Sequence, residues 1–335
     1  MRRIHLYFII LVISFPFLAS FETNPYNPKL HAIYQSPEGI LFKSFSTEWN
    51  QEKLIDLYHE LVKNKHGNEL KQLRAVEVIG TTLDDSFSKG SYDYLNKTIK
   101  LYQGDQYQEP SQYQETLSHE YGHHFAYHYF PSHHLPLSKW QKIRNLNLLD
   151  LRWDAFWNYQ DKYHAIYPQE VFADDYVLLY GATKEVDPKD VETNEAFYLR
   201  TEHENQQISN VLENSSLHSL LEEETGIEID QSRLLHMPTF SNYKDAELSF
   251  TIKPKINIAY RLNLTLNDSK GNTFNYESYQ IHRDESEDEL IFHLEDLLKE
   301  NLSNYEWLSA SIDVIDLDTS IGFETEEWKM DIEDI

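Results

Sequence analysis

A nine-residue stretch, Thr116-Leu-Ser-His-Glu-Tyr-Gly-His-His124, constrains this chain more than any other feature. It contains the pattern H-E-x-x-H, with His119 and His123 four positions apart. Side chains at this spacing lie one turn apart on the same face of an α-helix, where two imidazole nitrogens can bind one tetrahedral zinc ion. Glu120 then lies beside the open coordination position, where it can act as a general base. The motif has this meaning only if the stretch is helical.

Local signals predict that helix. Pro110 marks its start, and Ser111 with Gln114 three positions later is typical of a capping box. Pro131 marks its end. Gly122 inside the helix is about 1 kcal/mol less favourable than alanine. We therefore expect another backbone, or the wall of a substrate site, to lie close to this glycine.

The amino terminus and the charge indicate an exported protein. Residues 1–5 are basic and residues 6–18 are apolar, which is too short a run for a membrane span of about 20 residues. This pattern is typical of a signal peptide over residues 1–20, cleaved near Ala19-Ser20, with an uncleaved amino-terminal anchor as the alternative. The chain has no cysteine, and its net charge of −27 argues against nucleic acid or an anionic membrane as a partner. We expect a secreted protein, or one held at a bacterial cell surface.

A third metal ligand is expected downstream of the motif. Pro168 and Gly181 bound a predicted helix in which Glu170 and Asp174 are i,i+4 neighbours on one face. The glutamate can complete a zinc site, and the aspartate can accept a hydrogen bond from the far nitrogen of a ligand histidine. The alternative third ligands are the aspartates between the two helices, Asp150 and Asp154.

Residues in the two predicted helices indicate which class of zinc metallopeptidase the motif resembles. Ala126 and Tyr129 stand where a metzincin has its glycine and third histidine, so that class is excluded. The pattern H-E-x-x-H followed by E-x-x-x-D on a second helix resembles the gluzincin metallopeptidases. The sequence Glu170-Val-Phe-Ala-Asp174 is most similar to the corresponding stretch in the catalytic domain of anthrax lethal factor and related secreted zincins.

This resemblance implies a role for each residue of the site. His119, His123 and Glu170 would be the zinc ligands, Glu120 the general base, and Asp174 a hydrogen-bond partner of a ligand. A tyrosine just before the third ligand stabilises the oxyanion in such domains. Tyr163, seven positions before Glu170, is our choice for this role, and Tyr167 is the alternative.

The predicted architecture is an α+β zincin-like catalytic domain, mainly helical with a small sheet, followed by an all-β immunoglobulin- or fibronectin-like sandwich. The predicted boundaries are a leader over residues 21–46, the catalytic domain over 47–240 and the sandwich over 245–335. Alternating apolar residues predict the strands of the sandwich. These strands cover residues 247–252, 258–266, 274–281, 290–294, 307–317 and 321–325.

Shorter patterns predict the rest of the catalytic domain. Helices are expected at residues 49–64, 139–147 and 208–224, and strands at 75–79, 91–94 and 98–102. The aromatic residues between the two metal helices are expected to lie mostly in the core, with a substrate cleft as the alternative for some of them, and they are Trp140, Trp153, Phe156, Trp157 and Tyr159.

The sequence therefore favours a zinc metalloendopeptidase with a protein or peptide substrate. The alternative is a surface-binding or adhesion protein in which the sandwich binds the target and the zinc domain is a scaffold.

Overall fold

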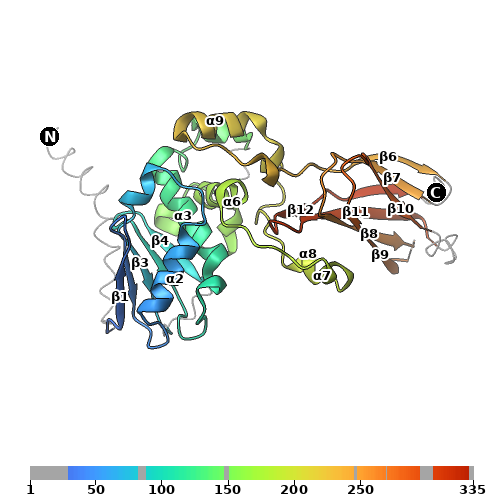
Figure 1. Ribbon diagram of the computed structural model, residues 1–335. Helices are drawn as coiled ribbons and strands as arrows, with labels where there is room; N and C mark the ends of the chain where they lie inside the picture. Colours follow the sequence, from blue (N-terminus) through green and yellow to red (C-terminus); the bar gives the residue numbers. More distant parts are fainter. Residues whose placement is uncertain are drawn as a thin grey trace, which may run out of the picture.

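The computed structural model describes residues 29–81, 88–146, 151–244, 247–268, 270–294 and 305–331. The signal peptide predicted over residues 1–20 and the alternative ligand Asp150 lie outside these ranges. The described chain is a mixed α/β structure with a helical region and several sheets, as expected (Figure 1). None of its helices is long and apolar enough to cross a membrane.

A five-stranded sheet forms one side of the first half of the chain. Its strand order is β1-β2-β3-β5-β4, with parallel pairing from β2 to β3 and from β3 to β5. Its strands are β1 (Ala32–Gln35), β2 (Leu41–Ser44), β3 (Ala75–Val78), β4 (Gly90–Asp93) and β5 (Thr98–Leu101). Residues 32–44, which the sequence placed in a leader, are thus part of the sheet, because β2 pairs with β3 along its whole length.

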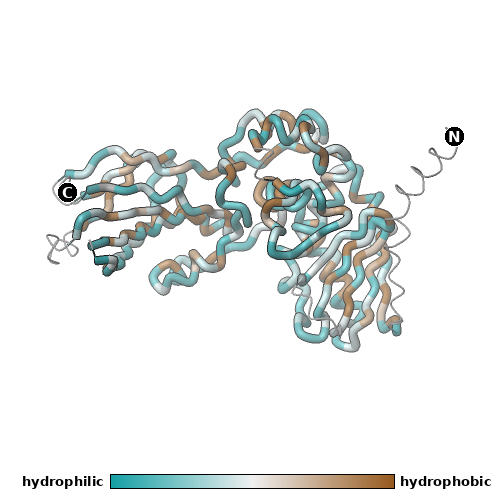
Figure 2. Tube along the Cα trace, turned by 180° about the vertical axis from the view of Figure 1, so that it is seen from behind, coloured by the Kyte–Doolittle hydropathy of each residue, from teal (hydrophilic) through white to brown (hydrophobic). Residues whose placement is uncertain are grey.

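Helices cover one face of this sheet. The buried residues of α2 (Gln51–Leu61) are Leu54, Leu57 and Leu61, and they share one core with Phe42 of β2 and Val76 of β3. The long helix α3 (Gln114–Tyr129) also packs on the sheet, and α6 (Pro168–Tyr180) packs against α3. Figure 2 shows hydrophobic stretches along the strands of this sheet and in the helices beside it.

Smaller helices complete this half of the chain. They are η1 (Asn68–Gln72), η2 (Pro110–Tyr113), α4 (Lys139–Arg144), α5 (Ala155–Asn158), η3 (Asp161–Ile166), η4 (Val211–Glu213), α9 (Ser215–Thr225) and η5 (Gln231–Arg233).

Gly122 lies where α3 and α6 come closest. A Cβ atom built on Gly122 would lie 3.0 Å from both Cα and the carbonyl oxygen of Ala173. The expectation of a neighbouring backbone at this glycine is confirmed, and that backbone belongs to α6. The close approach brings the two helices that carry the predicted ligands side by side.

The last third of the chain forms two antiparallel sheets. One has the order β10-β7-β6 and the other β12-β11-β8-β9, with β13 also paired to β11. The rings of Phe250 on β7 and Trp328 on β13 lie 5.5 Å apart, so the two sheets pack face to face. The strands are β6 (Thr239–Lys244), β7 (Glu247–Thr251), β8 (Ile258–Asn267), β9 (Thr273–His282), β10 (Glu289–His293), β11 (Trp307–Asp316), β12 (Gly322–Glu324) and β13 (Trp328–Asp331).

Each strand predicted in this region is present, and two strands were not predicted. Strand β6 ends at Lys244, so this region begins before the predicted boundary at residue 245. Strand β13 continues the edge of β11 beyond β12.

The chain also crosses between its two parts earlier than the sequence suggested. After α6, the short helices α7 (Lys189–Glu192) and α8 (Glu195–Tyr198) pack on the later sheets, and Figure 1 shows them beside β8 and β9. Their shared core consists of Val186, Val191, Ala196, Phe197, Ala259, Ile315 and Leu317. The predicted domain over 47–240 is therefore interrupted.

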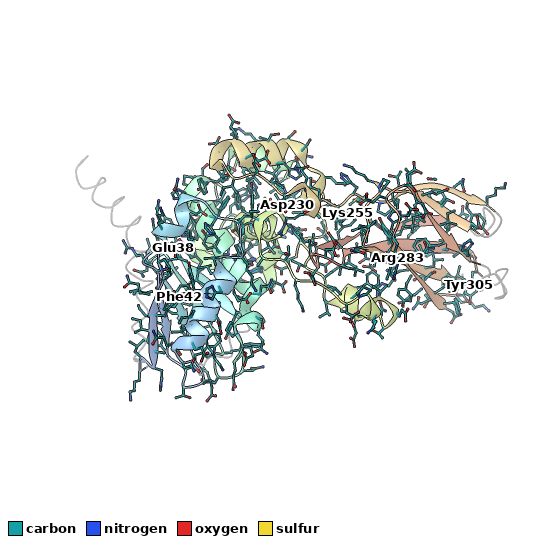
Figure 3. The ribbon with its side chains drawn as sticks, in the orientation of Figure 1. Glu38, Phe42, Asp230, Lys255, Arg283 and Tyr305 are labelled. Atoms are coloured by element: carbon teal, nitrogen blue, oxygen red, sulfur yellow. The ribbon has the colours of Figure 1, made fainter. Side chains whose placement is uncertain are left out.

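We use two names for the resulting parts. The N-terminal unit comprises residues 29–181 and 203–235, and the C-terminal unit comprises residues 184–201 and 239–331. Side chains also join the units near their shared border. Lys255 of the C-terminal unit donates a hydrogen bond to the carbonyl oxygen of Ser232, and Figure 3 shows Lys255 close to Asp230.

Candidate metal centre

The helix that carries the H-E-x-x-H motif forms as expected, but its cap lies earlier. The side chain of Gln112 accepts a hydrogen bond from the backbone N–H of Glu109, and Pro110 takes the first helical position. The predicted pair, Ser111 and Gln114, does not cap the helix, because a turn of 3₁₀-helix, η2, precedes α3. The 3₁₀ turn therefore starts one residue after Glu109, and α3 itself starts at Gln114.

A buried carboxylate fixes the rotation of α3. Glu69 of η1 is fully buried and accepts hydrogen bonds from the hydroxyls of Tyr121, at 2.8 Å, and Tyr129, at 2.7 Å. The backbone N–H of Gly67 also donates to this carboxylate. Because Tyr121 and Tyr129 face Glu69, the side of the helix that carries His119 faces α6 instead. Glu69 was not singled out from the sequence.

The three predicted ligands converge on one point. The Nε2 atom of His119 lies 3.2 Å from Oε2 of Glu170, and Nε2 of His123 lies 3.0 Å from the same oxygen. Within the described residues, His119, His123 and Glu170 are the group of side chains that could hold a metal ion. Two imidazole nitrogens and a carboxylate oxygen are a donor set that zinc accepts.

The far nitrogen of His119 is also held. Its Nδ1 lies 3.0 Å from Oδ1 of Asp174, one turn after Glu170 on α6. This hydrogen bond fixes the tautomer that leaves the Nε2 lone pair free for a metal. Burial opposes protonation of His119, but the hydrogen bonds to Asp174 and Glu170 outweigh it and raise the pKa of His119 well above its ordinary value. The predicted partnership of Asp174 with a ligand histidine is thus present.

Glu120 lies in the same cleft and is buried. A Cβ atom built on Gly90 of the edge strand β4 would lie 2.8 Å from Oε1 of Glu120, so this strand passes directly over the carboxylate. Burial raises the pKa of Glu120, although the nearby histidines His123 and His119 act in the opposite direction. A carboxylate with a raised pKa is a stronger base than an exposed one.

Tyr163, predicted at the oxyanion position, lies outside the cleft. Its ring packs against the guanidinium of Arg152 at 4.1 Å. The alternative, Tyr167, is fully buried and donates its hydroxyl hydrogen to the carbonyl oxygen of Asn158. The hydroxyl of Tyr167 is thus engaged with the backbone, and the role of Tyr163 at the oxyanion stays a prediction.

His164 occupies the place expected of Tyr163. Its Nε2 lies 3.2 Å from Oε2 of Glu170, and its Nδ1 forms a short hydrogen bond with Glu204. Burial alone would lower its pKa, but the hydrogen bonds to Glu170 and Glu204 raise the pKa of His164 to about 10. The sequence reasoning missed this residue, and its only signal was a histidine six positions before the third ligand.

The remaining candidates lie elsewhere. Asp154, the alternative third ligand, forms an ion pair with Arg152 and is not part of the ligand group. His124 is buried between the hydroxyl of Tyr92 and the carbonyl oxygen of Glu69, which is a structural role.

The ligands open into a cleft of about 880 Å³. Strand β4 forms one wall, and aromatic side chains from several elements line the cleft. Phe156 and Tyr159 are among them and are 59% and 45% exposed, so for these two the alternative of a cleft position holds rather than the core. Trp140 is buried as expected and donates its indole hydrogen to Asp175. The other aromatic residues lining the cleft are Tyr92, Tyr94, Tyr102 and Tyr127.

Neither a protein-family model nor a curated protein sequence matches this chain. A function for the chain therefore has to be inferred from the arrangement of its own side chains.

Proposed function

We propose that this protein is a secreted zinc metallopeptidase that hydrolyses peptide bonds. One observation carries the proposal: Nε2 of His119 and Nε2 of His123 lie within 3.2 Å of one Glu170 oxygen, beside a buried Glu120 in an open cleft. We further propose a zincin-like fold for the N-terminal unit, and an immunoglobulin- or fibronectin-like sandwich for the C-terminal unit.

Different residues of the cleft would bind the metal, orient a ligand and transfer the proton. His119, His123 and Glu170 would hold the zinc ion, and Asp174 orients His119. When bound, zinc polarises a carbonyl group and increases the acidity of water. Glu120 accepts the proton of the attacking water and passes it to the leaving amine. Its burial beneath Gly90 keeps its carboxylate in one position.

The edge of the five-stranded sheet gives the substrate a place to bind. Strand β4 is the last strand of that sheet, so among the residues that the structure describes one side of its backbone has no strand partner. Residues 88–92 line the cleft next to the ligands. An extended peptide can pair with such an edge and place its scissile carbonyl over the metal. This geometry favours an endopeptidase acting on an extended segment.

The first experiment measures zinc per protein molecule, together with hydrolysis of a peptide library. We expect one zinc in the parent chain, its loss in Glu170→Ala, and its retention in the matched control Asp154→Ala, whose carboxylate pairs with Arg152. Glu120→Gln should keep the zinc and lose hydrolysis. Absence of zinc from the folded parent chain would refute the proposal. Zinc with biological activity that survives Glu120→Gln would favour a binding protein built on a zinc scaffold.

A further inference from the structure

One short segment belongs to both units. Residues 200–204, which we call the bridging segment, leave the C-terminal unit after α8 and enter the cleft of the N-terminal unit. Both Glu202 and Glu204 line the cleft that contains the ligands. The segment is thus anchored on one unit and acts on the other.

The C-terminal unit holds the first half of the bridging segment tightly. The backbone N–H of Thr201 donates to the carbonyl oxygen of Ser320 at 2.7 Å, and the N–H of Gly322 donates to the carbonyl oxygen of Thr201 at 3.0 Å. The side chain of Arg200 forms a short ion pair with Asp313, a fully buried residue of β11. Burying this charged pair ties the backbone at residue 200 to the middle of the sheet.

The second half of the bridging segment contacts the metal centre. The backbone N–H of Glu204 donates to Oδ2 of Asp174 at 3.0 Å, while the other oxygen of Asp174 holds His119. The carboxylate of Glu204 holds Nδ1 of His164, and Nε2 of His164 contacts Glu170. Each of the two carboxylates of α6 at the site is therefore steadied by Glu204, directly or through one histidine.

We infer that the C-terminal unit is a positioning element of the metal centre, acting through Arg200, Thr201 and Glu204, rather than a spacer. Hydrogen-bond partners behind metal ligands commonly change metal affinity by about 10- to 100-fold. Here the partner Glu204 is placed by contacts that lie in another unit. The inference rests on the proposed metal site, but it does not require peptide hydrolysis.

The test compares two arginines that share one carboxylate. Arg200 and Arg261 both pair with Asp313, but Arg200 also pairs with Glu202 of the bridging segment, whereas Arg261 lies on β8 and is outside that segment. We expect Arg200→Ala to raise the zinc dissociation constant of the full chain by about 10-fold, as removal of an outer partner does. The control Arg261→Ala should change it less than about threefold, although it removes a cation from the same Asp313. Equal effects of the two variants, or no effect of either, would overturn the inference.

A double variant tests whether the two ends of the bridging segment act together. Glu204→Gln removes the carboxylate that holds His164 and should also weaken zinc binding. If Arg200 works through Glu204, the zinc dissociation constant of the double variant should equal the larger of the two single-variant constants, because the effects of coupled sites do not add. Additive effects would show two independent contributions and would contradict the inference. Should Arg200→Ala fail to fold, Arg200→Lys keeps the charge and is measured in its place.

Hydrogen exchange of the metal-free chain separates this inference from the proposed function. In Arg200→Ala, the amide of Glu204 and those of α6 should exchange faster, and in Arg261→Ala they should exchange as in the parent chain. A parent chain that binds no zinc but shows this pattern would refute the metallopeptidase and keep the coupling. Zinc binding by the parent chain with unchanged exchange in Arg200→Ala would refute the coupling and keep the metallopeptidase.

Discussion

Gly90 is the position where a single methyl group would test the geometry of the site. A Cβ atom there would lie 2.6 Å from Cγ2 of Thr116, 2.8 Å from Oε1 of Glu120 and 3.0 Å from Cγ of Glu120. Real Cβ atoms keep ordinary contacts at 3.4–4 Å. In Gly90→Ala, the side chain of Glu120 must therefore move, or β4 must move away from α3.

The size of the effect depends on these distances. Restoring ordinary contact requires a shift of Glu120 by roughly half an ångström, and a misplacement of about 1 Å lowers a catalysed rate about 100-fold. We therefore expect kcat/KM to fall about 10-fold in Gly90→Ala. The zinc dissociation constant should stay within about threefold of the parent, because none of the ligands touches the new methyl group. Crowding should also lower the free energy of unfolding by about 1–3 kcal/mol.

The assay is the rate of hydrolysis of a library peptide, with zinc affinity and urea unfolding measured on the same samples. Gly104→Ala is the matched control, because its Cβ would also lie 2.6 Å from a side chain, Cγ1 of Val78, but outside the cleft. It should lose stability and keep its rate. Thr116→Ser removes Cγ2, so Gly90→Ala with Thr116→Ser should regain stability without regaining activity.

Two results would refute this reasoning. A parent-like rate in Gly90→Ala would mean that the position of Glu120 does not control hydrolysis. An equal loss of rate in Gly90→Ala and Gly104→Ala would assign the loss to stability alone.

Three other side chains, in the site and around it, allow further predictions. Asp174→Asn should weaken zinc binding about 10- to 100-fold, because His119 loses its carboxylate partner; unchanged affinity by competition with a chelator would contradict this. Tyr163→Phe should keep kcat/KM within about twofold of the parent value, since its ring stays on Arg152. A large loss of kcat/KM in a peptide assay would instead assign the Tyr163 hydroxyl a role in catalysis. Burial lowers the pKa of His133 to about 3, below its value of about 6.5 in the unfolded chain. The unfolded chain therefore binds the proton first as pH falls, so this histidine should remove about 2 kcal/mol of stability between pH 7 and pH 5. Urea unfolding should show that slope in the parent chain but not in His133→Asn.

The group of candidate ligands could be predicted from the sequence because each depends on spacing within one helix. His119 and His123 are one turn apart on α3, and Glu170 and Asp174 are one turn apart on α6. Helical periodicity fixes such pairs before any tertiary contact forms. The sequence also marked where the two helices meet, since Gly122 stands at their closest approach.

The place of His164 beside Glu170 could not be predicted in the same way. Tyr163 and His164 are neighbours in η3, a short 3₁₀-helix, and successive side chains in such a turn point in different directions. His164 is held beside Glu170 by Glu204, forty positions later in the chain, and no local pattern contains that information.

Two parts of the architecture were missed for a related reason. Strand β2 is stabilised by parallel pairing with the distant β3, and β1 by pairing with β2, so no local pattern contains the information that places them in the sheet. The excursion over α7 and α8 was placed in the wrong unit because reading along the chain assumes that each unit is continuous.

That excursion also has a consequence for how the chain folds. Val191 and Phe197 leave the ribosome well before Ala259 and Ile315, the strand residues that bury them. Until β8 and β11 have been made, the apolar side of α7 and α8 has no partner in its own core. Pairing between segments so far apart in sequence is slow, because a long loop must close first. The C-terminal unit therefore completes this core only after β11 has been made, and we expect a chain that stops before β11 to leave the apolar side of α7 and α8 open to proteases.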